Sequence, residues 1–78
     1  MPRVQRKPVL IDIPPTATSF VFYDDEGDNY VHPVIGESLD KLSVELPYRP
    51  IWLKVTTPTS IVYYHILPTG EVHKHETS

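Results

Sequence analysis

The sequence predicts an all-β protein, a small sandwich or barrel of about five to seven short, mainly antiparallel strands with an extended N-terminal arm. Two observations predict this class. Nine prolines are spread along the 78 residues, and a proline inside an α-helix or a central strand removes a backbone donor and clashes with its surroundings. The segments between the prolines are rich in valine, isoleucine, tyrosine and phenylalanine, which favour strands.

Residues 1–15 are predicted to be an extended, basic and proline-rich arm that includes a short edge strand, and residues 16–78 a single β domain. Three basic residues, Arg3, Arg6 and Lys7, stand in the arm with no acidic residue before position 12. Such a segment is expected to contact a negatively charged partner. All ten acidic residues of the chain follow Lys7, so the body of the protein is acidic.

The first half of the chain contains three predicted strands. Val9–Ile13 alternates apolar side chains and ends at Pro14, after which pairing stops. Thr18–Tyr23 has apolar side chains on both faces, which indicates a strand that is either central or covered on one side by a partner. The loop Asp24–Asn29 contains Gly27 and predicts a hairpin, after which Tyr30–Val34 resumes the strand pattern.

Residues 36–46 are compatible with two structures. Ser38 could cap a helical turn that carries Leu39 and Leu42. The alternation of apolar residues from Leu42 onward predicts a strand instead. We expect a short turn at residues 37–41 followed by a strand at residues 42–46.

The clearest hairpin pairs Ile51–Thr56 with Ser60–Leu67 around a proline-containing turn. In a strand, neighbouring side chains point to opposite faces. Trp52 is therefore predicted to lie on the face opposite Leu53 and Val55. We expect this hairpin to be the centre of the fold.

Residues 71–76 form a final short strand or a frayed tail. His73 and His75 would share a face of that strand and could bind a divalent metal with Glu71 or His65. Histidines near a C-terminus also commonly lie in solvent. We expect no physiological metal site and no other cofactor.

The acidic loop is the other candidate metal site, because Ca²⁺ takes closely spaced carboxylate ligands. An EF-hand-like loop that starts at Asp24 would need a glycine at its sixth position and a glutamate at its twelfth. The chain has Asn29 and Ile35 there. We therefore interpret the loop as a solvated hairpin tip.

The sequence contains no catalytic motif, and we expect no enzymatic activity and no catalytic residue. With three glycines, it has neither a phosphate-binding loop nor a dinucleotide-binding fingerprint. The first ten residues contain no unbroken apolar segment of the length that a signal peptide or a membrane span requires. We expect a cytoplasmic protein without a membrane partner.

The aromatic residues give the strongest functional hypothesis. A chain of 78 residues without cysteine buries little surface and often gains stability by oligomerisation. Tyrosine and tryptophan are enriched at protein interfaces. Tyr48, Trp52 and Tyr63 are therefore predicted to form an interaction surface, together with the basic arm residues.

The leading hypothesis is a non-enzymatic β-module that self-associates as a homo-oligomer and docks on a larger protein assembly through its arm. Its composition is similar to that of small virion or accessory proteins of bacterial viruses, and this analogy implies a virion location. The alternative is a monomeric regulator or inhibitor that binds one protein through the acidic loop and nearby tyrosines. A third hypothesis is single-stranded nucleic-acid binding, which the acidic body disfavours.

Overall fold

The computed structural model describes residues 8–77, and within this range the protein consists of strands and connecting turns. The predicted all-β class is confirmed. The predicted arm residues Arg3, Arg6 and Lys7 lie outside the described residues. The strands are β1 (Val9–Asp12), β2 (Ser19–Tyr23), β3 (Asn29–Tyr30), β4 (Val34–Glu37), β5 (Lys41–Val44), β6 (Ile51–Thr56), β7 (Ile61–Ile66) and β8 (Val72–Thr77).

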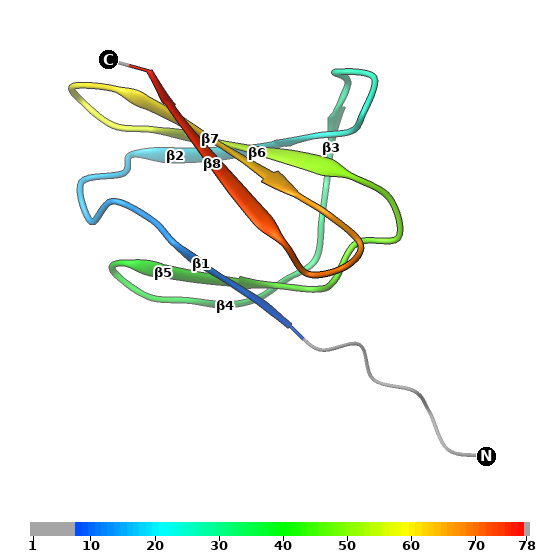
Figure 1. The fold of residues 1–78 in the computed structure, drawn as a ribbon. Coiled ribbons are helices and arrows are strands. Elements are labelled where there is room, and N and C mark those ends of the chain that lie inside the picture. The colour runs from blue at the N-terminus through cyan, green and yellow to red at the C-terminus, as the bar shows by residue number, and fades with distance from the viewer. Residues whose placement is uncertain (1–7, 78) are drawn as a thin grey trace.

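The strands form two sheets that pack face to face as the two layers of a sandwich (Figure 1). The larger sheet has the order β3-β2-β6-β7-β8, and the smaller sheet has the order β1-β5-β4. Every pairing is antiparallel. The predicted β6–β7 hairpin is confirmed, and β6 is the central strand of the larger sheet.

The described residues contain eight strands, more than expected, because the predicted strand Tyr30–Val34 is divided between the two sheets. Tyr30 ends β3 in the larger sheet, and Val34 begins β4 in the smaller one. Pro33 lies at the crossing and has no N–H group to pair. The expected strand at residues 42–46 is β5, which begins and ends earlier, and residues 36–46 form no helical turn.

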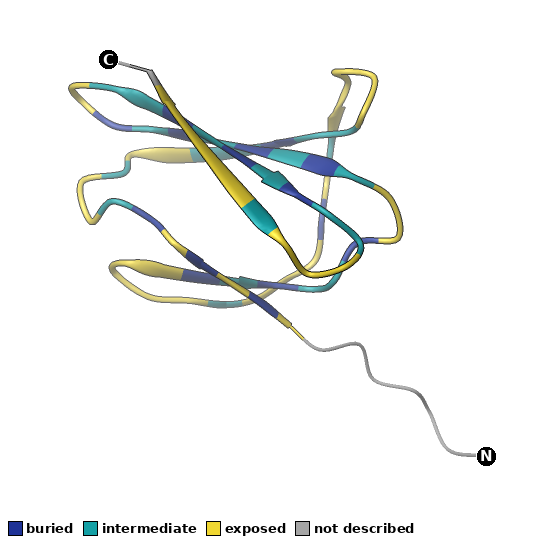
Figure 2. Ribbon diagram, viewed as in Figure 1, coloured by how far each residue is buried: buried dark blue, intermediate teal, exposed yellow. Residues whose placement is uncertain are grey.

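The core lies between the inner faces of the two sheets. Burial alternates along β6 and β7, so that every second residue is inaccessible to solvent (Figure 2). The predicted arm segment contributes to the same core, because Val9, Ile11 and Ile13 are buried in it. The buried apolar residues are Val9, Ile11, Ile13, Phe22, Leu42, Val44, Ile51, Leu53, Val55, Val62, Tyr64 and Ile66.

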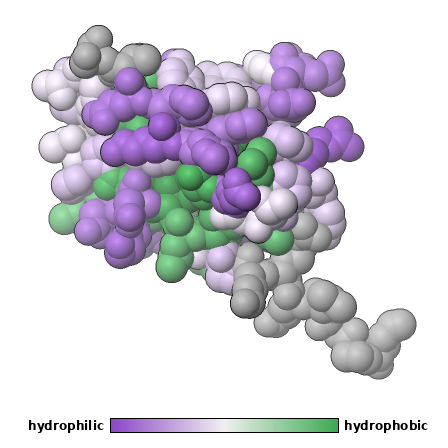
Figure 3. Space-filling model, in the orientation of Figure 1, coloured by the Kyte–Doolittle hydropathy of each residue, from purple (hydrophilic) through white to green (hydrophobic). Residues whose placement is uncertain are grey.

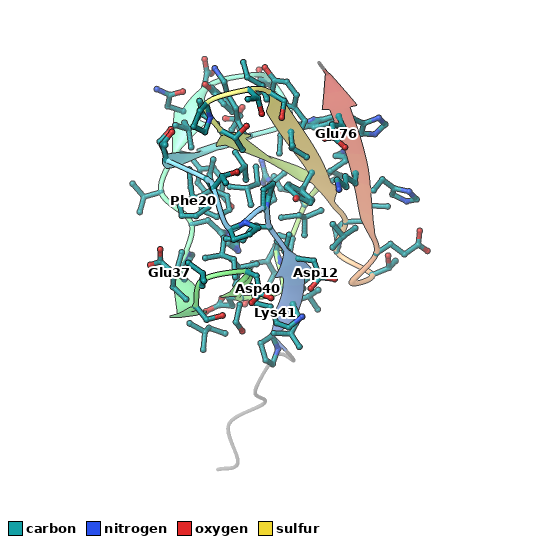
Figure 4. The ribbon with its side chains drawn as sticks, turned by 90° about the vertical axis from the view of Figure 1, so that its left-hand side faces the viewer. Asp12, Phe20, Glu37, Asp40, Lys41 and Glu76 are labelled. Atoms are coloured by element: carbon teal, nitrogen blue, oxygen red, sulfur yellow. The ribbon has the colours of Figure 1, made fainter. Side chains whose placement is uncertain are left out.

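One hydrogen bond links the two sheets where β1 and β7 face each other. The Tyr64 hydroxyl donates to the backbone oxygen of Asp12 at 2.7 Å. Beside it, the Lys41 ammonium donates to the Asp12 carboxylate at 2.7 Å, so that β1 and β5 are also joined by an exposed ion pair (Figure 4). Burial, together with the charges of Glu76 and Asp12, raises the pKa of the Tyr64 phenol.

Strand β8 is the longer of the two edge strands of the larger sheet. Lys74 pairs with Tyr64, and Glu76 pairs with Val62, so both charged side chains project from the core-facing side of the sheet. A polar surface covers this strand, and apolar surface begins below it (Figure 3). Inward-pointing charges discourage a further strand from pairing with an edge. Among residues 8–77, the structure contains no helix long and apolar enough to cross a membrane.

Candidate interaction surfaces

The outer face of the larger sheet carries an aromatic cluster on its central strands. Trp52 and Lys54 of β6 alternate with buried residues and therefore point away from the core, as do Tyr63 and His65 of β7. The predicted orientation of Trp52, opposite Leu53 and Val55, is confirmed. The cross-strand register places Trp52 against His65 and Lys54 against Tyr63.

Ring geometry shows that the cluster is packed. The Trp52 and His65 rings stack with centroids 4.2 Å apart and an interplanar angle of 13°. Tyr63 meets the indole edge-on at 6.5 Å, and His75 of β8 lies 5.7 Å from it. Such ring pairs contribute about 0.5–1.5 kcal/mol beyond the area that they bury. We call Trp52, Tyr63, His65 and His75 the aromatic cluster.

The cluster continues across neighbouring strands into a wider face. Tyr23 of β2 pairs with Trp52, and Val21 pairs with Lys54. His73 of β8 pairs with His65, and its Nε2 lies 3.2 Å from a Glu71 carboxylate oxygen. The face thus presents aromatic and apolar groups at its centre and exposed histidines along β8.

The candidate metal ligands do not converge within the described part of the chain. Residues 8–77 contain no group of three or more histidine or acidic side chains placed to hold a metal ion. In the acidic loop, Asp24 Oδ1 accepts hydrogen bonds from the backbone N–H groups of Glu26 and Asp28, each at 2.9 Å. Gly27 has φ 89°, so the loop is a turn held by its own first carboxylate.

A cleft of about 650 Å³ opens at the end of the sandwich where β3 crosses toward β4 and β5 leads toward β6. It lies apart from the aromatic cluster, because neither Trp52 nor Tyr63 lines it. The residues that line the cleft are Asp24, Tyr30, His32, Pro33, Glu45, Leu46, Pro47, Tyr48, Arg49 and Ile51.

Two hydrogen bonds fix the wall of the cleft. His32 is buried, and its Nε2 donates to the backbone oxygen of Glu45 at 2.6 Å. Because a carbonyl oxygen can only accept, Nε2 carries a proton in the bond to Glu45, and Nδ1 forms a second hydrogen bond with the Tyr30 hydroxyl. Burial raises the pKa of the Tyr30 phenol, and the nearby charges of Asp24 and Glu45 act in the same direction.

The structure separates the predicted site residues. It brings Trp52 and Tyr63 together on the outer face of the larger sheet. Tyr48 is 77% exposed and lines the cleft.

Sequence reasoning missed two features of these surfaces. His65 belongs to the aromatic cluster, and the same alternation that placed Tyr63 on the outer face could have placed His65 beside it. The hydrogen bond that fixes His32 could not be found in this way, because its acceptor, the backbone oxygen of Glu45, lies on a distant segment.

Comparisons of the chain with protein-family models, with curated proteins and with solved structures gave no match. The functional argument therefore depends on the geometry of these surfaces.

Proposed function

We propose that this protein is a non-enzymatic β-sandwich module that self-associates through the outer face of its larger sheet and docks on a larger protein assembly. The aromatic cluster is the observation that carries the proposal. It places a tryptophan and a tyrosine, the residue types most enriched at interface centres, on the solvent side of the two central strands.

The surroundings of the cluster support the same function. Val21 and Ile61 lie on the outer face with partly exposed side chains, so apolar surface extends beyond the rings. A domain of this size buries only a little over about 60% of the surface that its unfolded chain exposes, less than a larger domain does, and association adds buried area. The face is isologous if two copies pair through it, which gives a closed dimer with two-fold symmetry.

Light scattering coupled to size-exclusion chromatography tests self-association across low to high micromolar concentrations. We expect a concentration-dependent increase in mass that Trp52→Ala abolishes. Leu39→Ala is the matched control, because Leu39 is 78% exposed and lies outside the larger sheet. A chain that stays monomeric at every concentration contradicts the proposal.

The assembly on which the module docks is proposed to be a virion or a cytoplasmic complex, and the composition of the chain supports the first. The genes that flank this one provide the test. A series of structural virion genes would support the viral assembly, and a neighbourhood of unrelated metabolic genes would contradict it.

A monomeric regulator is the second candidate, supported by a cleft that combines Tyr30 and Tyr48 with the acidic residue Asp24. Such a protein would remain monomeric and would bind its target through the acidic loop. Replacing Asp25 and Glu26 by Asn and Gln leaves the turn intact, because Asp24 holds it. In an assembly subunit these changes should leave the oligomeric mass unchanged.

A further inference from the structure

The outer face of the larger sheet carries three of the four histidines of the chain. His65 lies on β7, and His73 and His75 lie on the neighbouring strand β8. The register pairs His65 with His73 and Tyr63 with His75, so all three imidazoles project from the side of the sheet that carries Trp52. Histidine is the side chain that ordinarily changes its charge between about pH 5 and pH 8. The charge of this face therefore depends on pH in that range.

At neutral pH the other charged groups on this face balance each other. Lys54 projects from β6, and the Glu71 carboxylate lies 3.2 Å from Nε2 of His73. On β2, Tyr23 adds a phenol to the face, and phenols are neutral in acid. Among the described residues, the face thus combines one lysine and one carboxylate with uncharged aromatic groups.

Protonation of the histidines changes this balance. Two further charged residues of β8, Lys74 and Glu76, project from the opposite side of the sheet, where their charged groups lie 3.8 Å apart. They therefore offset each other and not the charge of the outer face. In acid, the outer face gains three positive charges, and the described residues of its paired strands supply no further carboxylate to offset them.

The surroundings of His65 suit a neutral ring. Its Nε2 is buried and has no hydrogen-bond partner within the described part of the chain, and the Trp52 indole stacks on the ring at 4.2 Å. A neutral imidazole carries a proton on only one nitrogen, whereas the protonated ring donates from both. Protonation of His65 would therefore bury an N–H group without an acceptor, which is unfavourable.

Association through this face brings two copies of the same charges together. In a two-fold pair, each copy presents the same surface to the other, so three protonated histidines on one copy meet three on its partner. Like charges repel more strongly where the contact excludes water and ions than on an exposed face. The stack of His65 on Trp52 is present in the monomer and in the pair, so any attraction between a charged ring and the indole does not alter the difference.

We propose that acid weakens self-association through the aromatic cluster, because protonation of His65, His73 and His75 gives both contacting faces the same charge. This inference rests on the proposed function, in which a second copy of the chain covers the face. A partner with an acidic surface would show the opposite dependence, since protonated histidines would attract it. The sign of the pH dependence therefore identifies the occupant of the face.

Sedimentation at several protein concentrations measures the dissociation constant of the pair at about pH 7.5 and about pH 5.5, on either side of the ordinary titration of histidine. We expect association to be at least about tenfold weaker at the lower pH, the effect of one pKa unit of difference between the free and associated states. Equal or tighter association in acid would overturn the inference and leave self-association standing. A chain that is monomeric at both pH values would overturn the proposed function, and the inference with it.

A triple variant separates the histidines of the face from other effects of acid. His73→Gln and His75→Gln replace exposed rings, and His65→Phe keeps a flat ring against Trp52 and costs Nε2 no hydrogen bond. The fourth histidine, His32, is buried beside the cleft and is retained. The dissociation constant of this variant should be about equal at the two pH values. Continued loss of association in acid would assign the effect to other groups and overturn the inference.

The matched control changes the same strand on its other side. Lys74→Gln combined with Glu76→Gln removes one charge of each sign from the core-facing side of β8. This double variant should keep the full weakening of association in acid. Loss of the pH dependence in the control would show that the outer-face histidines do not cause it.

Salt tests the same charges without any substitution, and it decides the question if the triple variant does not associate. At about pH 5.5, raising the salt concentration from about 0.05 M to about 0.5 M should tighten association several-fold, because salt screens repulsion between exposed charges. At about pH 7.5 the same change should have little effect, since the charges of the face are balanced there. An acid effect that salt does not reduce would overturn the inference.

Discussion

The two faces of the β6–β7 hairpin share one backbone and one register, yet their side chains lie in different environments. On the inner face, Leu53, Val55 and Val62 are 0% exposed and pack against the smaller sheet. On the outer face, Trp52 and Tyr63 pack mainly against other side chains of the same sheet and remain partly exposed. Stability is therefore expected to depend on the inner face and recognition on the outer one.

The largest effect is expected from Leu53→Ala. It removes buried methyl groups from the centre of the core and leaves a cavity, which costs about 2–5 kcal/mol. Domains of this size can have a total stability of only about 5 kcal/mol. Urea denaturation followed by circular dichroism measures the loss, and a cost below about 1 kcal/mol would contradict the assignment of the core.

Trp52→Ala is expected to act on the outer face of the hairpin. Association should lose at least about 2 kcal/mol, because buried tryptophans at interface centres carry much of the binding free energy. The monomer should remain folded, since the Trp52 side chain projects from the face of β6 opposite the core. Sedimentation at several concentrations and denaturation of the monomer measure the two quantities.

The Trp52→Ala variant also tests whether the two faces of the hairpin have different roles. If it unfolds the monomer as severely as Leu53→Ala, both faces of the hairpin are intramolecular core. The aromatic cluster would then be a structural shield, and the argument for an interaction surface would lose its main support.

Tyr64→Phe changes the inner face and is expected to have an intermediate effect on the free energy of unfolding. It removes the hydroxyl that donates to the Asp12 backbone oxygen, which should cost about 1 kcal/mol at neutral pH. Denaturation midpoints of the variant and the unaltered chain, measured under the same conditions, give this difference.

The same residue predicts a loss of stability in alkali. Burial raises the folded-state pKa of Tyr64 above the ordinary value. At pH values between the unfolded-state and folded-state pKa, the native state therefore binds more protons than the unfolded state. The stabilisation is complete below about pH 10 and is lost as the pH rises through the folded-state pKa. Tyr64→Phe should unfold less steeply between pH 10 and pH 12, and an unchanged slope would contradict this origin.

The smallest effect is expected from Asp12→Asn. The Lys41 hydrogen bond and charge lower the pKa of the Asp12 carboxyl, but the two side chains are 55% (Lys41) and 86% (Asp12) exposed. Because the folded-state pKa is the lower one, any stabilisation is present above about pH 4 and is lost as the pH falls through the folded-state pKa. Neutral-pH denaturation should not distinguish the variant from the unaltered chain, whereas a clear loss would show a stronger ion pair than its exposure implies.

Local alternation was sufficient to predict the β6–β7 hairpin and the orientation of Trp52, because side chains two apart in a strand share a face whatever the strand packs against. The same rule identifies the buried residues of β1. In a strand with one covered face, the alternation of apolar residues is therefore enough to identify which side chains are buried.

Local pattern failed where the chain changes sheets. Pro33 interrupts the strand pattern of Tyr30–Val34, but the assignment of the two ends to different sheets is visible only in their partners. Tyr30 pairs with Phe22, and Val34 pairs with Val44. The cleft was missed for the same reason, since segments distant in sequence meet there. Tyr48 could be recognised as an exposed aromatic residue, but its separation from Trp52 depends on tertiary structure.

The mixture of near and distant pairings has a consequence for how the chain folds. Strands β6, β7 and β8 pair with their neighbours in sequence, whereas Val9 of β1 must find Val44 of β5. Closing that larger loop costs more chain entropy, and this cost arises before the β1–β5 contacts can stabilise the structure. We expect the β6–β8 meander to form in the transition state and β1 to join last, so that Val62→Ala slows refolding while Ile11→Ala mainly speeds unfolding. The opposite distribution of stopped-flow rates would place the nucleus in the smaller sheet.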